Sequence, residues 1–226
     1  KKETGSKLVM MDVSPRYLFW SARIPSRVMC VTPWVKILVL LRNPVDRAYS
    51  QYQMTASRHL IPGKASFEDW VKTDMGRLKN SGVIQTKIPQ KEFAGSDAET
   101  NAWERYTASV MGREGPIGRG LYVIQLRHWF KAYEENGKKR EDYFKIFLSE
   151  RLRKKKQNET RVVYEEALDF LGLPHKPLKG LNSFEQKYDG PMKKKTRSNL
   201  QEFFAPYNEQ LYDLLGAEWK GVWDPK

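Results

Sequence analysis

An apolar run that ends abruptly in a charged turn constrains the fold of this chain more than any other feature. Residues 35–41 read VKILVLL, and Arg42-Asn43-Pro44 follows at once. An apolar run without alternation is typical of a strand covered on both faces, as in a parallel sheet. Asn43 is a good helix N-cap and Pro44 suits the first helical position, so we expect a helix from there to about Arg58. A strand that leads directly into a helix indicates an α/β fold.

The rest of the chain continues this alternation. Residues 143–148 form a second apolar run, which predicts another inner strand. Amphipathic patterns predict helices over 122–133, 160–171 and 196–215. No internal repeat or linker divides the sequence. We therefore expect one α/β domain over residues 1–226, with a parallel sheet flanked by helices.

Shorter patterns predict the remaining segments. Pro25 favours a helix through Cys30, and Ser66 is expected to cap another helix. Residues 8–11 are a short apolar run that we interpret as the end of a strand. Residues 76–100 carry several glycines, a proline and many polar side chains, which predicts a long surface loop.

Composition limits the function classes. The formal net charge is +13, which attracts polyanions such as nucleic acid, acidic membranes, acidic glycans or phosphorylated cofactors. Cys30 is the single cysteine, so neither an internal disulfide nor a cysteine-based zinc site is possible. No apolar run approaches ~20 residues, so no segment of this sequence is expected to span a membrane.

The end of the first apolar run is the best candidate for an anion site. Ligands of open α/β sheets bind beyond the carboxyl ends of the strands, where Arg42 lies. The helix that follows is expected to add backbone N–H groups and a partial positive charge. Ser50 comes two helical turns after Asn43, so Arg42 and Ser50 together could hold a phosphate. Alternatively, Arg42 pairs with a carboxylate such as Asp46 and Ser50 faces solvent.

Residues 36–52 resemble the 3′-phosphate-binding segment of sulfotransferases that use 3′-phosphoadenosine 5′-phosphosulfate (PAPS). The likeness is greatest to the carbohydrate, heparan-sulfate-like branch and its bacterial and algal relatives. In that family, the arginine and serine of R-[DN]-P-x-x-R-x-x-S hold the 3′-phosphate of the cofactor. These residues match Arg42 and Ser50, and Arg47 matches the second arginine. Further segments resemble the family in its own order, at 12–17, 120–129, 147–152, 170–174 and 191–208.

The resemblance implies a P-loop-NTPase-like sulfotransferase fold and a definite reaction. A sulfuryl group would move from PAPS to a hydroxyl or amine on a carbohydrate, with an acidic or neutral glycan as the acceptor and no metal. The basic loop at Lys195, Thr196 and Arg197 would contact the phosphates of the cofactor, although three lysines read alone indicate only a solvated patch. The loop at 76–118 would help to shape the acceptor site. Family analogy also implies the Golgi lumen.

Two features of the family are not found in this sequence. The turn K-x-G-[TS]-[TS], which holds the 5′-phosphosulfate after the first strand, is absent, so the chain resembles the fold without its first strand and helix. The glutamate that usually serves as general base lies in that same part. Asp12 is the nearest substitute, whereas His59 and His128 are more often structural.

Several alternatives therefore stay open. The sequence is a fragment of a longer enzyme, or it is a catalytically inactive sulfotransferase-like structural or binding subunit of a larger assembly, or the resemblance misleads. The charge also permits a nucleic-acid-binding protein, but no helix-turn-helix, RRM or zinc pattern supports one. The triplet at Asn158 fits a glycosylation acceptor and weakly favours a secretory route.

Overall fold

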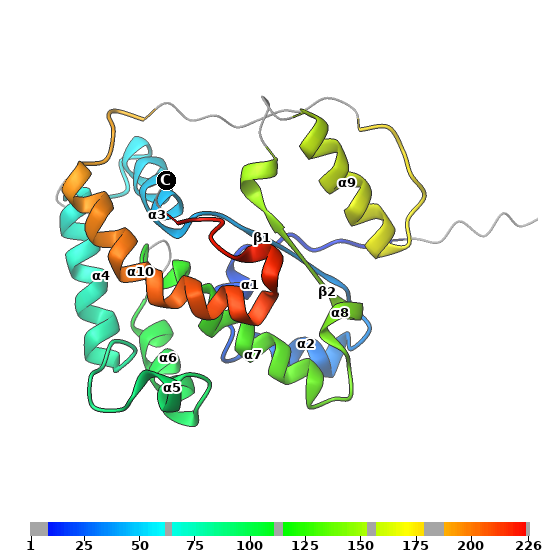
Figure 1. Ribbon diagram of the computed structural model, residues 1–226, viewed down its shortest axis with the longest axis horizontal. Coiled ribbons are helices and arrows are strands. Elements are labelled where there is room, and N and C mark those ends of the chain that lie inside the picture. The colour runs from blue at the N-terminus through cyan, green and yellow to red at the C-terminus, as the bar shows by residue number, and fades with distance from the viewer. Residues whose placement is uncertain (1–8, 62–64, 111–114, 153–156, 179–187, 225–226) are drawn as a thin grey trace, which may run out of the picture.

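Figure 1 shows the computed structural model, which describes residues 9–61, 65–110, 115–152, 157–178 and 188–224. Two parallel strands, β1 (Ile37–Leu41) and β2 (Phe144–Leu148), form the sheet. The helices follow the chain as α1 (Arg16–Phe19), α2 (Ile24–Val31), α3 (Pro44–Ser57), α4 (Phe67–Ser81), α5 (Gln90–Phe93), α6 (Asp97–Ser109), α7 (Tyr122–Glu134), α8 (Arg140–Tyr143), α9 (Gln157–Leu171) and α10 (Lys194–Leu215). Among the described residues there are also short 3-10 turns, at η2 (Gly118–Gly120), η3 (Ser149–Arg151) and η5 (Ala217–Trp219). The α/β class and the parallel sheet are confirmed.

One face of the sheet packs on α7. Val39 and Leu41 are buried, and the ring of Phe144 meets those of Phe130 and Tyr133 on α7. The opposite face is partly bare, since Leu38 is 38% exposed and Leu40 is 56% exposed. The prediction that this strand is covered on both faces is therefore wrong for β1. Its side chains alternate between buried and exposed because α7 covers only one side.

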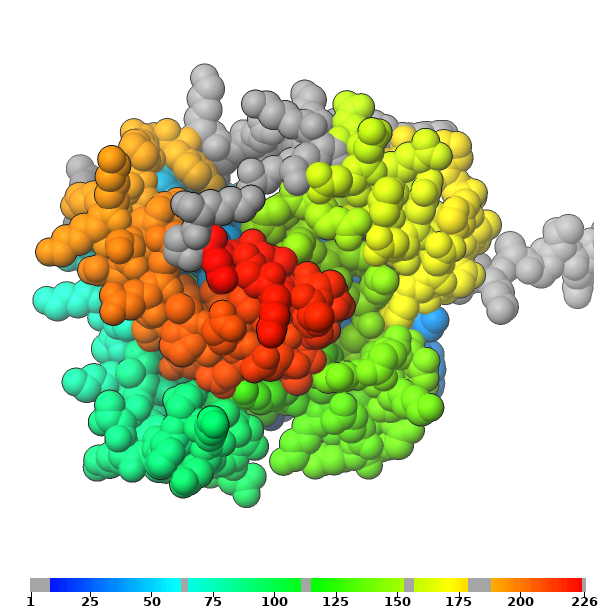
Figure 2. Space-filling view, viewed as in Figure 1, coloured from blue at the N-terminus to red at the C-terminus, as the bar shows by residue number. Residues whose placement is uncertain are grey.

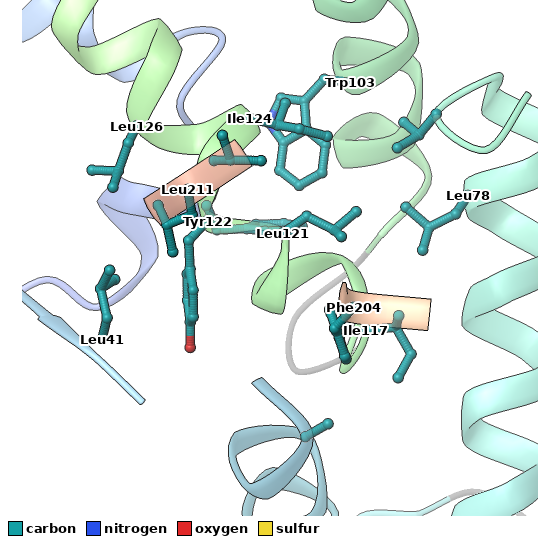
Figure 3. Close-up of a cluster of buried hydrophobic side chains, with 14 of the residues drawn as sticks. Leu41, Leu78, Trp103, Ile117, Leu121, Tyr122, Ile124, Leu126, Phe204 and Leu211 are labelled. Atoms are coloured by element: carbon teal, nitrogen blue, oxygen red, sulfur yellow. The ribbon is translucent and has the colours of Figure 1, made fainter. Parts of the chain in front are cut away.

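The helical part of the core lies where α10 crosses α7. Trp103 of α6, Leu121 next to α7 and Phe204 of α10 are almost fully buried, and Figure 3 shows them converging. Close contact is possible because Gly120 has no side chain: a Cβ there would lie 2.9 Å from atoms of Phe204 and Pro44. In Figure 2, α10 and the C-terminal residues cover the middle of this face of the molecule. None of the described helices is long and apolar enough to cross a membrane.

Two expectations about irregular segments need correction. The expected loop over 76–100 is shorter, because α4 continues through Gly76 to Ser81, α5 occupies Gln90–Phe93 and α6 begins at Asp97, which leaves 82–89 and 94–96 irregular. Helix α4 tolerates a glycine because two features stabilise it: the capping box at Ser66 and the buried apolar side chains of the helix. Residues 9–14 form no strand, and Val9, Met10 and Met11 are exposed. Residue 8 lies outside the described residues.

Candidate anion-binding site

The carboxyl ends of the two strands bring distant residues together. Leu41 pairs with Leu148 at the end of the sheet, so the residues that follow each strand emerge side by side. The backbone N–H of Asn43 donates to Oε1 of Glu150 at 2.6 Å. This contact joins the turn after β1 to the turn after β2 and fixes the edge at which Arg42 lies.

Arg42 has an anchored backbone and an unpaired side chain. Its carbonyl accepts a hydrogen bond of 2.9 Å from the hydroxyl of Tyr122, and burial raises the pKa of Tyr122 to about 12. The guanidinium has no hydrogen-bond or ion-pair partner among the described residues. Asp46, which was the alternative partner, instead accepts from Arg197 at 2.8 Å. Arg42 is thus a half-buried cation that the described part of the fold does not neutralise.

The backbone at the start of α3 is already occupied. Oδ1 of Asn43 accepts from the N–H groups of Val45 at 3.0 Å and Asp46 at 3.3 Å, which confirms the predicted N-cap. Pro44 has no N–H, and the N–H of Arg47 bonds to the Asn43 carbonyl at 2.8 Å. The first turn therefore has no spare N–H for a ligand, and the expected backbone contribution is wrong. The helix dipole and the side chains remain.

The two other polar side chains of the motif differ in environment. Ser50 is half-buried on α3, and its hydroxyl has no partner among the described residues. Arg47 donates to Oε1 of Gln51 at 2.8 Å and to the carbonyl of Pro116, and its Nε lies buried without a partner among the described residues. Burial lowers the pKa of Arg47. Arg47 thus ties α3 to the turn before η2, whereas Ser50 is available to a ligand.

A buried carboxylate shapes the turn that receives Arg47. Asp74 of α4 accepts hydrogen bonds from the hydroxyl of Tyr106 at 2.8 Å and from the N–H groups of Ile117 and Gly118 at 2.7 and 3.1 Å. Burial raises the pKa of Asp74, and these three donors oppose that effect. The turn is held in place, so its Pro116 carbonyl is positioned for α3.

The predicted basic loop is the start of α10. Lys193 is the N-cap, and Lys195, Thr196 and Arg197 lie in the first turn of the helix. Thr196 and Lys193 donate to Glu68 at 2.8 and 3.2 Å. Although burial opposes it, these two donors lower the pKa of Glu68. Lys195 is exposed and has no ion pair among the described residues. The structure thus brings Arg197 next to α3 through Asp46 and leaves Lys195 in solvent.

The candidate bases have contrasting surroundings. Asp12 is exposed and accepts from the hydroxyls of Tyr17 at 2.7 Å and Ser14 at 2.9 Å, which lower its pKa and weaken it as a base. His128 bonds to Ser21 and Thr100, and burial lowers its pKa to about 4. It is a structural residue. Within the described ranges no group of three His, Cys, Asp or Glu side chains could hold a metal ion.

Sequence reasoning gave no role to two residues that build this site. Tyr122 anchors the carbonyl of Arg42, and Glu150 anchors the N–H of Asn43. Both lie in segments that resemble the family, so their order along the chain was the available signal. Their partners are distant in the sequence, and local patterns do not reveal them.

Comparisons with known proteins agree with this architecture. A family model described as "Sulfotransferase domain" matches residues 22–210. The human protein "Heparan sulfate glucosamine 3-O-sulfotransferase 6" is 25% identical over 93% of this chain and 56% of its own length. The mouse protein "Heparan sulfate glucosamine 3-O-sulfotransferase 3A1" is 24% identical over 94% of this chain and 50% of its own length. The chain thus spans about half the length of these curated relatives.

The fold is also similar to a solved structure. The crystal structure of a sulfotransferase from Alicyclobacillus acidocaldarius superposes with a TM-score of 0.59 at 21% identity, over 91% of this chain and 65% of that chain. At this identity the likeness shows a shared fold. The family match covers most of the chain, so the alternative that the resemblance misleads is excluded. The chain belongs to the sulfotransferase domain family.

Proposed function

We propose that this chain binds the 3′-phosphate of PAPS with Arg42 and Ser50 and takes part in sulfuryl transfer to a hydroxyl or amine of a carbohydrate. Membership of the sulfotransferase family supports the reaction class. The names of these relatives, heparan sulfate glucosamine 3-O-sulfotransferases, support a carbohydrate acceptor. Asp12 stays a prediction as the general base.

The observation that carries this proposal is the unpaired guanidinium of Arg42 at the carboxyl edge of the sheet. A half-buried arginine at this edge that no carboxylate neutralises is free to pair with an anion. Its planar fork suits the oxygens of a phosphate, and the hydroxyl of Ser50 can donate as well. Because Asn43 occupies the backbone N–H groups, these two side chains are the donors that α3 and its leading turn offer.

In this reaction PAPS supplies the sulfuryl group, and the chain supplies binding and charge. Transfer of this kind depends on positioning and on stabilisation of the charge that develops, as in phosphoryl transfer. Arg42 and Ser50 would fix the 3′-phosphate end. Lys195 would add positive charge at the start of α10, where it has no ion pair among the described residues. Thr196 and Arg197 would reach a ligand only by exchanging their bonds to Glu68 and Asp46.

The direct test is calorimetric binding of the product nucleotide, 3′-phosphoadenosine 5′-phosphate (PAP), to the wild type and to variants. Arg42→Ala and Ser50→Ala should each weaken binding, by about 10-fold or more for Arg42, because a charge-assisted hydrogen bond is lost. Arg27→Ala removes an exposed arginine of α2 and should leave the affinity unchanged. Equal affinity in the wild type and Arg42→Ala would contradict the proposal.

Two further measurements address the finer claims. Incubation with PAPS and a heparan-type oligosaccharide, followed by mass spectrometry, separates a catalytic chain from one that only binds the nucleotide. By family analogy, we propose the Golgi lumen as the compartment of this reaction. Asn158 is exposed in the first turn of α9, so a glycosidase-sensitive mass at this residue in the native protein would support a secretory route.

A further inference from the structure

A hollow of about 340 Å³ lies between α6 and the segment that follows α4. One wall is a single face of α6, formed by Ala98, Asn101, Ala102 and Arg105 at helical spacing. The other wall comes from the segment between Gly82 and Phe93. We call this space the α6 hollow.

Small residues explain why the space is not filled by the protein. Ala98 and Ala102 bring only methyl groups to the wall of α6. Gly82 caps α4 in the left-handed region with a φ of 86°, and a Cβ there would lie 3.4 Å from Nη2 of Arg105. The chain thus passes close to the arginine and leaves the volume in front of it open to solvent.

Unpaired donors surround the α6 hollow. Nε of Arg105 donates to the carbonyl of Ser81 at 3.1 Å, while its two terminal nitrogens have no partner among the described residues. The side-chain ammonium of Lys87 and the side-chain amide of Asn101 likewise have no partner within that part of the chain. No carboxylate lines the space. The net charge of the lining is therefore positive, which favours an anionic ligand.

The wall opposite α6 is held by side-chain hydrogen bonds and is partly apolar. Oε1 of Gln85 accepts from the N–H groups of Lys87 and Ile88, at 2.7 and 2.8 Å, and its Nε2 donates to the carbonyl of Ile88. These bonds fix the turn that carries Lys87. Ile88 and the buried ring of Phe93 add apolar surface to the lining. An apolar wall beside cations and an amide suits a ring with C–H faces, hydroxyls and one anionic group.

The geometry points to a binding subsite for an anionic sugar unit, one that carries a carboxylate or a sulfate ester. This inference rests on the proposed function, because the carbohydrate acceptor comes from there. The α6 hollow is remote from the start of α10: Glu68 and Gly82 lie at opposite ends of α4, whose 15 residues span about 20 Å. The subsite would hold a distal unit of the acceptor chain and leave the reacting unit to the sheet edge.

The test measures binding of two disaccharides by calorimetry or by nuclear magnetic resonance titration. One disaccharide carries a sulfate ester and the other an unsulfated uronate, so the two arms identify which anion the site takes. Lys87→Ala removes a cation, and Ala98→Trp fills the space without changing charge. Each should weaken binding by about 10-fold. Lys72→Ala and Ala108→Trp are matched controls, because both residues are exposed and neither lines the hollow.

Binding of either disaccharide that both test variants weaken and both controls preserve would support the subsite. Absence of binding by both disaccharides, or binding that Ala98→Trp and Lys87→Ala leave unchanged, would overturn it. The binding of PAP is measured on the same variants and should not change in Ala98→Trp. If the disaccharides fail to bind while PAP still binds, the subsite is wrong and the proposed function stands. If a disaccharide binds while PAP does not, the subsite stands and the proposed nucleotide site is wrong.

Discussion

At the scale of single residues, buried charge decides how the site is held. Asp74 is 1% exposed, yet its carboxylate accepts three hydrogen bonds from Tyr106 and from the turn at Ile117 and Gly118. This turn also accepts a hydrogen bond from Arg47 of α3, at the carbonyl of Pro116. Three donors hold this buried carboxylate in place, and removal of the carboxylate would leave all three of them unpaired. Asp74 thus positions α3 without lying at the candidate site.

His128 should make stability depend on pH. Its folded-state pKa of about 4 lies below the ordinary value of 6.5. Between these two pH values His128 is therefore protonated in the unfolded chain and neutral in the folded chain. The contribution of neutral His128 to the free energy of unfolding is fully present above about pH 6.5. It falls as the pH decreases towards 4, by up to about 3 kcal/mol. His128→Asn should lose this slope relative to the wild type in urea unfolding at pH 7.5 and 4.5.

The matched control for His128 is His59→Asn. His59 is exposed, and asparagine tolerates its φ of 53°. This control should keep the slope of the wild type. An unchanged slope in His128→Asn would show that the buried imidazole is not the group that titrates.

The sequence predicted the strand and the capped helix that carry Arg42 and Ser50, because strand and cap signals are local. Arg42 directly follows an apolar strand and Ser50 lies two turns along the helix that Asn43 caps, so the sequence alone predicts that the two share one site. The side chain of Asn43 also accepts from the backbone N–H groups that a ligand would otherwise use. The sequence alone does not tell whether the cap or the ligand takes them. The pairing of Asp46 with Arg197 was equally hidden, because 151 residues separate the two.

At the scale of elements, two glycines with opposite roles give a matched test. A Cβ at Gly76 meets nothing within 4 Å, and this residue lies inside α4, so Gly76→Ala should stabilise the protein by about 0.5–1 kcal/mol. A Cβ at Gly120 would lie 2.9 Å from Phe204 and Pro44, so Gly120→Ala should destabilise it by about 1–3 kcal/mol. Chemical denaturation measures both. Changes of the same sign would contradict this packing.

The contact between α3 and α10 gives a prediction about affinity. Asp46 holds Arg197 at 2.8 Å and places a carboxylate one turn after Arg42. Asp46→Asn removes a charge that repels an anion and releases Arg197, so the affinity for PAP should rise about 3- to 10-fold. The lost ion pair is partly exposed and should cost no more than about 1 kcal/mol of stability. Calorimetry tests this, with the exposed Asp213→Asn as the control, and weaker binding by Asp46→Asn would refute it.

At the scale of the whole molecule, the sequence predicted the class of the fold better than it predicted which faces of the sheet the helices cover. Strand runs, caps and glycines gave the α/β alternation because each is a local property. The bare side of β1 at Leu38 and Leu40 was not predictable, since an apolar run does not say how many layers cover it. The helix through Gly76 was missed for a related reason: a capping box and buried contacts outweighed one unfavourable residue.

Binding at the sheet edge should stabilise the entire fold. The candidate site joins the ends of both strands to α3 and α10, so a ligand there binds only the folded chain. At a concentration 100 times its Kd, PAP should add about 2.7 kcal/mol, or roughly 5–10 °C in Tm for a chain of this size. Arg27→Ala controls for the loss of one positive charge from the +13 net charge, because it should keep the full shift by PAP. A shift by PAP that persists in Arg42→Ala would assign the effect to overall charge and remove the sheet edge as its site.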